Sequence, residues 1–79
     1  MARQNKKVLR RKIAQAWQHQ ARTVEIMTDM AVMFDEHHKD YAEYMQAIAQ
    51  SAYITMEFIQ DVATKAWGYW PEDVETWLK

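Results

Sequence analysis

Cysteine is absent from this chain of 79 residues, and glycine and proline occur once each, as Gly68 and Pro71. Without cysteine the chain has neither a disulfide framework nor a thiolate nucleophile. No apolar run approaches the roughly 18 residues of a membrane span, and the basic residues 10–12 interrupt any apolar signal segment. We therefore expect a cytoplasmic protein of a bacterial or host cell, with no membrane partner.

Recognisable catalytic patterns are also missing. The chain has no glycine-rich phosphate loop and no spacing typical of a Ser–His–acid triad. Asp35 and His38 stand three positions apart and could offer two metal ligands from one helical face. The Glu-x-x-His motif of di-iron bundles does not occur, and helix-end roles explain these residues. The expectation is a protein that is not an enzyme, with no catalytic residues, metal or cofactor.

The chain is nevertheless rich in apolar side chains, at 49% of its residues, and 13% are aromatic. A disordered chain lacks the apolar surface needed to offset its conformational entropy, so residues 1–79 are expected to form one helical domain with residues 1–4 frayed. Two helices cannot cover this much apolar surface. We therefore expect self-association, most simply a homodimer that forms a helical bundle.

Helical periodicity runs through most of the chain, which contains no glycine or proline before Trp67. Apolar residues recur at alternating steps of three and four, which is the spacing of one helical face. In the first half they are Ile13, Trp17, Val24, Met27, Ala31 and Phe34, and in the second half Tyr41, Met45, Ile48, Ala52, Ile59, Val62 and Ala66.

The segment 35–40, Asp-Glu-His-His-Lys-Asp, decides the architecture. The three–four spacing continues through His38, so periodicity alone permits a single helix of roughly 90 Å. Asp40 and Glu43, however, have the spacing of a capping box. This pattern favours a long antiparallel hairpin with helices at about 5–36 and 40–67, and one continuous helix is the alternative.

A short third helix is expected near the C-terminal end. Gly68 suits the left-handed residue that follows a helix. Pro71 suits the first position of the next helix, and the acids that follow it favour a first turn. The prediction is a helix over 71–78, giving an all-α fold.

Charge is distributed very unevenly. Residues 1–22 contain seven basic residues and no acid, whereas residues 23–79 contain three basic residues and eleven acids, a balance of 3 − 11 = −8. The basic side chains that suit phosphate contacts are Arg3, Lys6, Lys7, Arg10, Arg11 and Lys12. With Trp17 downstream, this segment resembles the arginine-rich RNA-binding helices of phage antitermination peptides, in which a basic helix precedes a stacking tryptophan. That resemblance implies nucleic-acid binding, with a solvated helix end or an acidic protein partner as the other interpretations.

The C-terminal segment is the second candidate. It contains Trp67, Tyr69, Trp70 and Trp77, and such residues are common anchors of protein interfaces. In an antiparallel hairpin this segment would meet Arg10 and Arg11, and the six residues together form the predicted partner-binding site. The other interpretation is that these rings plug the open end of the hairpin, with Glu72, Asp73 and Glu75 neutralising the basic cluster.

Small size, surplus aromatic surface and opposed charges favour a non-enzymatic protein–protein interaction module. Inhibitors, adaptors and assembly factors, including small phage-type proteins, have this style of sequence. Nucleic-acid binding through the basic helix is one alternative, and a structural homo-oligomer is another.

Overall fold

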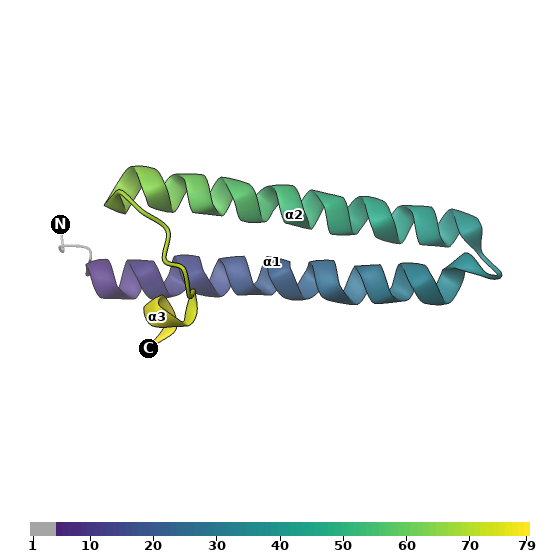
Figure 1. Cartoon of the computed structure of the whole chain (residues 1–79), viewed down its shortest axis with the longest axis horizontal. Helices are drawn as coiled ribbons and strands as arrows, with labels where there is room; N and C mark the ends of the chain where they lie inside the picture. The colour runs from purple at the N-terminus through teal and green to yellow at the C-terminus, as the bar shows by residue number, and fades with distance from the viewer. Residues whose placement is uncertain (1–4) are drawn as a thin grey trace.

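The computed structural model describes residues 5–79, apart from the side chain of Asp35. It contains three helices: α1 (Lys6–Asp35), α2 (Lys39–Trp67) and α3 (Glu75–Leu78). The two long helices lie side by side and antiparallel, and the chain measures 53 × 25 × 21 Å (Figure 1). The predicted all-α hairpin is confirmed, and the alternative of one continuous helix is wrong. Residues 1–4, which were predicted to be frayed, lie outside the described part.

Within residues 5–79, no helix combines the length and the apolar character needed to cross a bilayer.

The turn between the long helices spans residues 36–38, one position earlier than expected. The backbone N–H groups of His37 and His38 both donate to the carbonyl oxygen of Phe34, at 3.1 and 2.7 Å, and close α1. His38 precedes α2 and makes no side-chain capping hydrogen bond. Asp40 already lies inside the first turn of α2, so the predicted capping box with Asp40 as N-cap is wrong. An aromatic cluster stabilises the turn instead: the ring of His38 stacks on Tyr41 with centroids 4.8 Å apart.

Small residues separate α1 from α2. The buried apolar residues of these helices are all alanines: Ala14, Ala31, Ala42, Ala49, Ala52 and Ala63. Because alanine projects only a methyl group, the two helices approach closely. On α1 the predicted row from Ile13 to Phe34 is buried or half-buried, as expected.

The predicted core face of α2 is partly wrong. Tyr41, Ile48 and Val62 belong to the expected row, yet they are 47%, 43% and 55% exposed. Ala42, Ala49 and Ala63 of a neighbouring row are buried in their place. Ala52 of the predicted row is also buried, and its members Met45 and Ile59 are half-buried, as expected. The helix has apolar residues around more than one side, and a two-helix hairpin covers only one of them.

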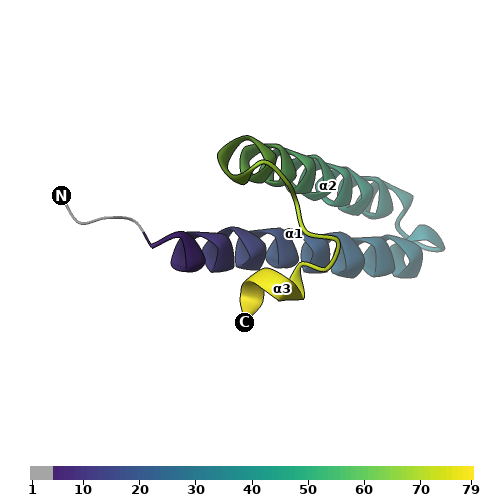
Figure 2. The same cartoon turned by 60° about the vertical axis from the view of Figure 1, so that its left-hand side comes forward.

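The segment after α2 crosses α1 and brings α3 against the opposite end of the hairpin from the turn (Figures 1 and 2). The helix begins at Glu75, not at Pro71 as predicted, and contains four residues. Pro71 is buried in the connecting segment. A carboxylate oxygen of Asp73 accepts a hydrogen bond from the backbone N–H of Glu75 at 3.0 Å, so the acid caps a later turn than expected.

Gly68 ends α2 in the left-handed conformation, with φ of 87°, as its position predicts. Gly68→Ala should lower the free energy of unfolding by about 1–2 kcal/mol, because a Cβ disfavours positive φ. A Cβ built at this position meets no atom within 4 Å, so the cost is purely conformational. Urea denaturation followed by circular dichroism measures it. Gly68→Asn is the control, since asparagine tolerates positive φ better than alanine does. Equal losses of unfolding free energy in the two variants would contradict the explanation.

Candidate functional site

Trp77 is the centre of an aromatic cluster at the open end of the hairpin. The rings of Trp67, Tyr69 and Trp70 each meet it edge to face, with centroids 5.4, 5.5 and 5.5 Å away. Trp77 is 5% exposed and packs with the fully buried Ala14 and Ala63. Edge-to-face contacts between aromatic rings are favourable beyond the area they bury. The C-terminal segment therefore closes the open end of the hairpin.

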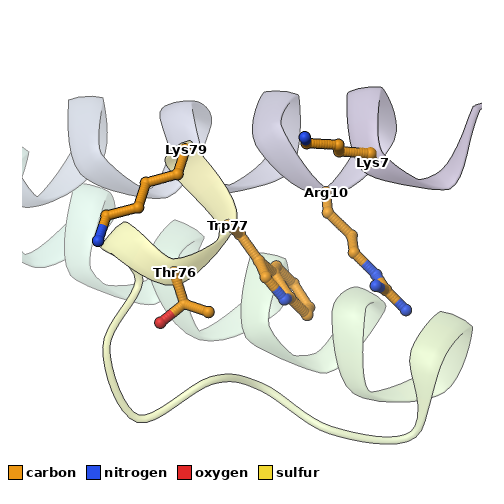
Figure 3. Close-up of a pocket in the computed structure, with 5 residues that line it drawn as sticks. All are labelled: Lys7, Arg10, Thr76, Trp77 and Lys79. Atoms are coloured by element: carbon orange, nitrogen blue, oxygen red, sulfur yellow. The ribbon is translucent and has the colours of Figure 1, made fainter.

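Arg10 connects this cluster to the basic start of α1. Its guanidinium carbon lies 5.6 Å from the ring centroid of Trp77 and 5.8 Å from that of Trp67. At this distance the cation is attracted to the negative face of an aromatic ring. The contact holds a positive charge at the edge of the aromatic cluster (Figure 3).

A cavity of about 230 Å³ lies between the first turns of α1 and the short helix α3 (Figure 3). Lys7, Arg10, Thr76, Trp77 and Lys79 line it. The lining contains three basic side chains and one indole, and no Asp or Glu side chain. Its chemistry suits an anionic group.

We call this cavity with its surroundings the cationic–aromatic end. It comprises Lys7, Arg10, Arg11, Trp67, Tyr69, Trp70, Trp77 and Lys79.

The acidic tail does not neutralise these cations in the way expected from the sequence. Among the described residues, Arg22 forms an ion pair with Glu25 at 3.2 Å, and a carboxylate oxygen of Glu36 lies 3.9 Å from Nε2 of His37. Arg11 instead donates a long hydrogen bond of 3.5 Å from Nη2 to the backbone oxygen of Lys79. The first turn of α1 also contains no acidic side chain that would complement the helix dipole or pair with these cations. The cationic–aromatic end thus keeps its positive charge available to a ligand.

The start of α1 is capped by Asn5, a role that the charge pattern did not indicate. Its Oδ1 accepts hydrogen bonds from the backbone N–H groups of Lys7 and Val8, at 2.9 and 3.4 Å. Basic side chains near a helix start oppose the macrodipole and cost about 0.3–1 kcal/mol each where exposed. The cap offsets part of that cost while Lys6 and Lys7 remain exposed.

The predicted partner-binding residues are brought together, although not all on the surface. Tyr69 is 48% exposed, and Trp77 is buried. Trp67 and Trp70 are half-buried, as are Arg10 and Arg11. Accessible contacts at this end therefore come from Tyr69, the ring edges and the basic side chains, while Trp77 holds them in place.

The alternative set of nucleic-acid contacts is spread around α1. Lys7, Arg10 and Arg11 are near α3, whereas Lys12 is five positions after Lys7 and therefore about 140° away around the helix. Lys6 and Lys12 are exposed, and Arg3 lies outside the described residues.

Trp17, which the resemblance places as a stacking residue, is half-buried against Trp70, with centroids 5.7 Å apart. Its indole Nε1 is buried without a hydrogen-bond partner.

Lys79 and Thr76 line the cavity, but the sequence did not single them out. The only sequence feature that could have drawn attention to these two residues is their closeness to Trp77 along the chain. Their meeting with Lys7 and Arg10, some seventy positions earlier in the chain, depends entirely on the crossing of segment 68–74 over α1.

The described residues contain no group of three His, Cys, Asp or Glu side chains close enough to hold a metal ion. The side chain of Asp35, one member of the candidate pair with His38, lies outside the described part.

No family model, no curated protein and no solved structure matches this chain. The functional interpretation therefore rests on the geometry of the chain itself.

Proposed function

We propose that this protein is a non-enzymatic interaction module that binds an acidic segment of a protein partner through the cationic–aromatic end. Inhibitors, adaptors and assembly factors, including phage-type proteins, work by this kind of docking. The observation that carries the proposal is the cavity lined by Lys7, Arg10 and Lys79 against the indole of Trp77.

The chemistry of this end is typical of protein interfaces. Arginine and large aromatic residues are enriched among the residues that contribute most binding energy. Arg10 is already held against two rings, so binding costs little side-chain entropy at this position. Tyr69 offers an exposed aromatic face beside it. A carboxylate of the partner would enter the cavity, and an apolar neighbour would contact Tyr69.

Nucleic-acid binding is the alternative at the same end. A protein that follows a phosphate backbone usually presents its cations as a continuous patch or stripe. Here Lys12 faces away from Lys7 around α1, and Lys7, Arg10 and Lys79 border one small cavity. The arrangement therefore favours a short acidic peptide over an extended nucleic acid.

A titration with defined probes tests the proposal. A glutamate-rich peptide that contains one aromatic residue and a single-stranded RNA of the same length are each titrated at low salt, followed by tryptophan fluorescence. We expect the peptide to bind more tightly than the RNA. The double variant Lys7→Glu with Lys79→Glu should weaken peptide binding by about tenfold or more, because each cation becomes a repulsive charge at the cavity.

The matched control is Lys12→Glu, which changes the same type of charge on α1 away from the cavity. It should change the affinity by less than about threefold, through screened long-range attraction only. If Lys12→Glu and the double variant lost the same affinity for the peptide, the cavity would not be the binding site. Tighter binding of RNA, with a steep salt dependence that Lys12→Glu flattens, would favour the nucleic-acid alternative.

A further inference from the structure

An exposed apolar face runs along α2. Among the described residues, twelve large hydrophobic side chains are exposed, and seven of them belong to this helix. Five recur at steps of a helical row and are called the α2 stripe below: Tyr41, Tyr44, Ile48, Phe58 and Val62. Tyr44 and Phe58 are 68% and 65% exposed. Isolated exposed apolar residues are ordinary, but several large ones aligned along one helical row mark an interaction surface.

The amount of surface agrees with an uncovered interface. The chain exposes 6306 Å², whereas a compact monomer of its mass exposes about 5,000 Å². The difference of roughly 1,300 Å² reflects the rod shape of a two-helix hairpin and exceeds the roughly 800 Å² that each partner buries in a specific interface of standard size. A second helix laid along the α2 stripe would remove much of this excess.

The order of residues along the stripe identifies a second copy of the chain as the occupant. Ser51 and Thr55 occupy the middle of the same helical row, between the two apolar ends. Positions 44 and 62, 48 and 58, and 51 and 55 are each equidistant from position 53. An antiparallel pair of α2 helices, with its two-fold axis level with position 53, therefore places Tyr44 opposite Val62 and Ile48 opposite Phe58 of the second copy, while Tyr41 lies level with Lys65. The polar residues meet each other at the centre.

Other registers lose this match. A shift of one heptad would bring Ser51 or Thr55 opposite an aromatic or branched residue of the second copy, leaving apolar ends unpaired. A polar layer at a defined position is a known means of fixing the register of paired helices. The hydroxyl of Thr55 already donates to the backbone oxygen of Ser51 at 3.0 Å, so its burial does not leave that donor unsatisfied.

Charges beside the stripe favour the same arrangement. Asp40 and Lys65 are 65 − 40 = 25 positions apart, almost seven turns at 3.6 residues per turn, so both lie on the same flank of α2. In the antiparallel register, Lys65 of the second copy lies level with Tyr41, one residue or about 1.5 Å along the helix from Asp40, and the symmetry repeats this pair. A parallel alignment would instead leave Asp40 and Lys65 of the second copy about 37 Å apart along the helices, so the pair would not form. Opposite charges at these flanking positions set the orientation of paired helices.

We propose that the protein is a homodimer in which the α2 stripes of two copies pack antiparallel about a two-fold axis level with position 53. This arrangement places the two cationic–aromatic ends at opposite ends of the dimer. The proposal goes beyond the docking function and does not depend on it, because the stripe and the cavity share no residue.

Sedimentation equilibrium of the full chain, from micromolar to near-millimolar concentration, tests the interface. The wild type should fit a monomer–dimer equilibrium, and Phe58→Glu should raise the dimer dissociation constant by about 30-fold or more, because it buries a charge in an apolar layer. Val32→Glu is the control: Val32 is 73% exposed but lies on α1, and the change should have little effect. Circular dichroism confirms that both variants remain helical.

A charge exchange tests the register. Asp40→Lys and Lys65→Glu should each weaken the dimer by about tenfold, since each creates two symmetry-related repulsions. The double variant should recover most of the wild-type affinity. Within one chain these residues are about 37 Å apart along α2 at 1.5 Å per residue, so recovery requires contact between copies. A monomeric wild type, a dimer unaffected by Phe58→Glu, or a double variant weaker than both single variants would overturn the proposal.

Discussion

Trp77→Ala should lower the free energy of unfolding by about 3–5 kcal/mol, the usual cost of removing a large buried aromatic side chain. Trp77 is 5% exposed and contacts three other rings and the side chain of Arg10. Domains of this size are stabilised by only about 5–10 kcal/mol in total. The loss is therefore a large part of the total stability. Thermal unfolding followed by circular dichroism and tryptophan fluorescence measures it.

The same change should also remove the candidate site, because the indole forms one wall of the cavity and holds Arg10 in place. Tyr69→Ala is the matched control. It deletes a ring of the same cluster, but one that is 48% exposed, so it should cost about half as much or less. Similar losses of stability in the two variants would contradict the central role of Trp77.

Ala31→Leu should lower the free energy of unfolding by about 1–3 kcal/mol, because it forces a larger side chain between closely packed helices. Ala31 is 3% exposed on the face of α1 that meets α2. For a domain of this length, the melting temperature should fall by roughly 4–8 °C per kcal/mol. The reason is the alanine packing of this core: Ala31 is buried between the helices, so three more carbon atoms must displace neighbouring side chains or the facing backbone.

Ala16→Leu separates this effect from helix propensity. Ala16 lies on the same helix but is exposed, and leucine is nearly as good a helix former as alanine. The control should therefore change the stability by less than about 0.5 kcal/mol. If Ala31→Leu left the melting temperature unchanged or raised it, the helices would be less closely packed than the structure indicates.

The turn illustrates how local chemistry predicted the architecture correctly but its details incorrectly. The reversal within residues 35–40 was expected from a capping box at Asp40 and Glu43. The chain does turn there, but Asp40 lies within the first turn of α2 and His38 precedes it. The aromatic row that argued for a continuous helix closes the turn: Phe34 meets Tyr41 edge to face, with centroids 5.6 Å apart. Periodicity through a turn can therefore reflect packing between the two helices that it joins.

The candidate site was predicted as one group of residues, but its cavity and the participation of Lys7, Thr76 and Lys79 were not. The basic start and the aromatic tail were both singled out, and an antiparallel hairpin already implied that they meet. Their geometry required the position of segment 68–74, which buries Trp77 and brings Lys79 to the same cavity as Lys7. Four residues of α3 are too few for periodicity to locate them, so the predicted helix over 71–78 began too early.

The sequence by itself determined the two long helices, the end of α2 at Gly68 and the concentration of positive charge at the start of α1. These features follow from local spacing, from the conformational freedom of one glycine and from composition. Only the tertiary structure decided which apolar row of α2 faces α1. Several rows satisfy the helical period. The side of α2 that contains the buried alanines packs against α1, because small side chains let two backbones approach most closely. The same choice leaves Tyr44, Ile48 and Phe58 exposed, and with them the surface on which the proposed dimer depends.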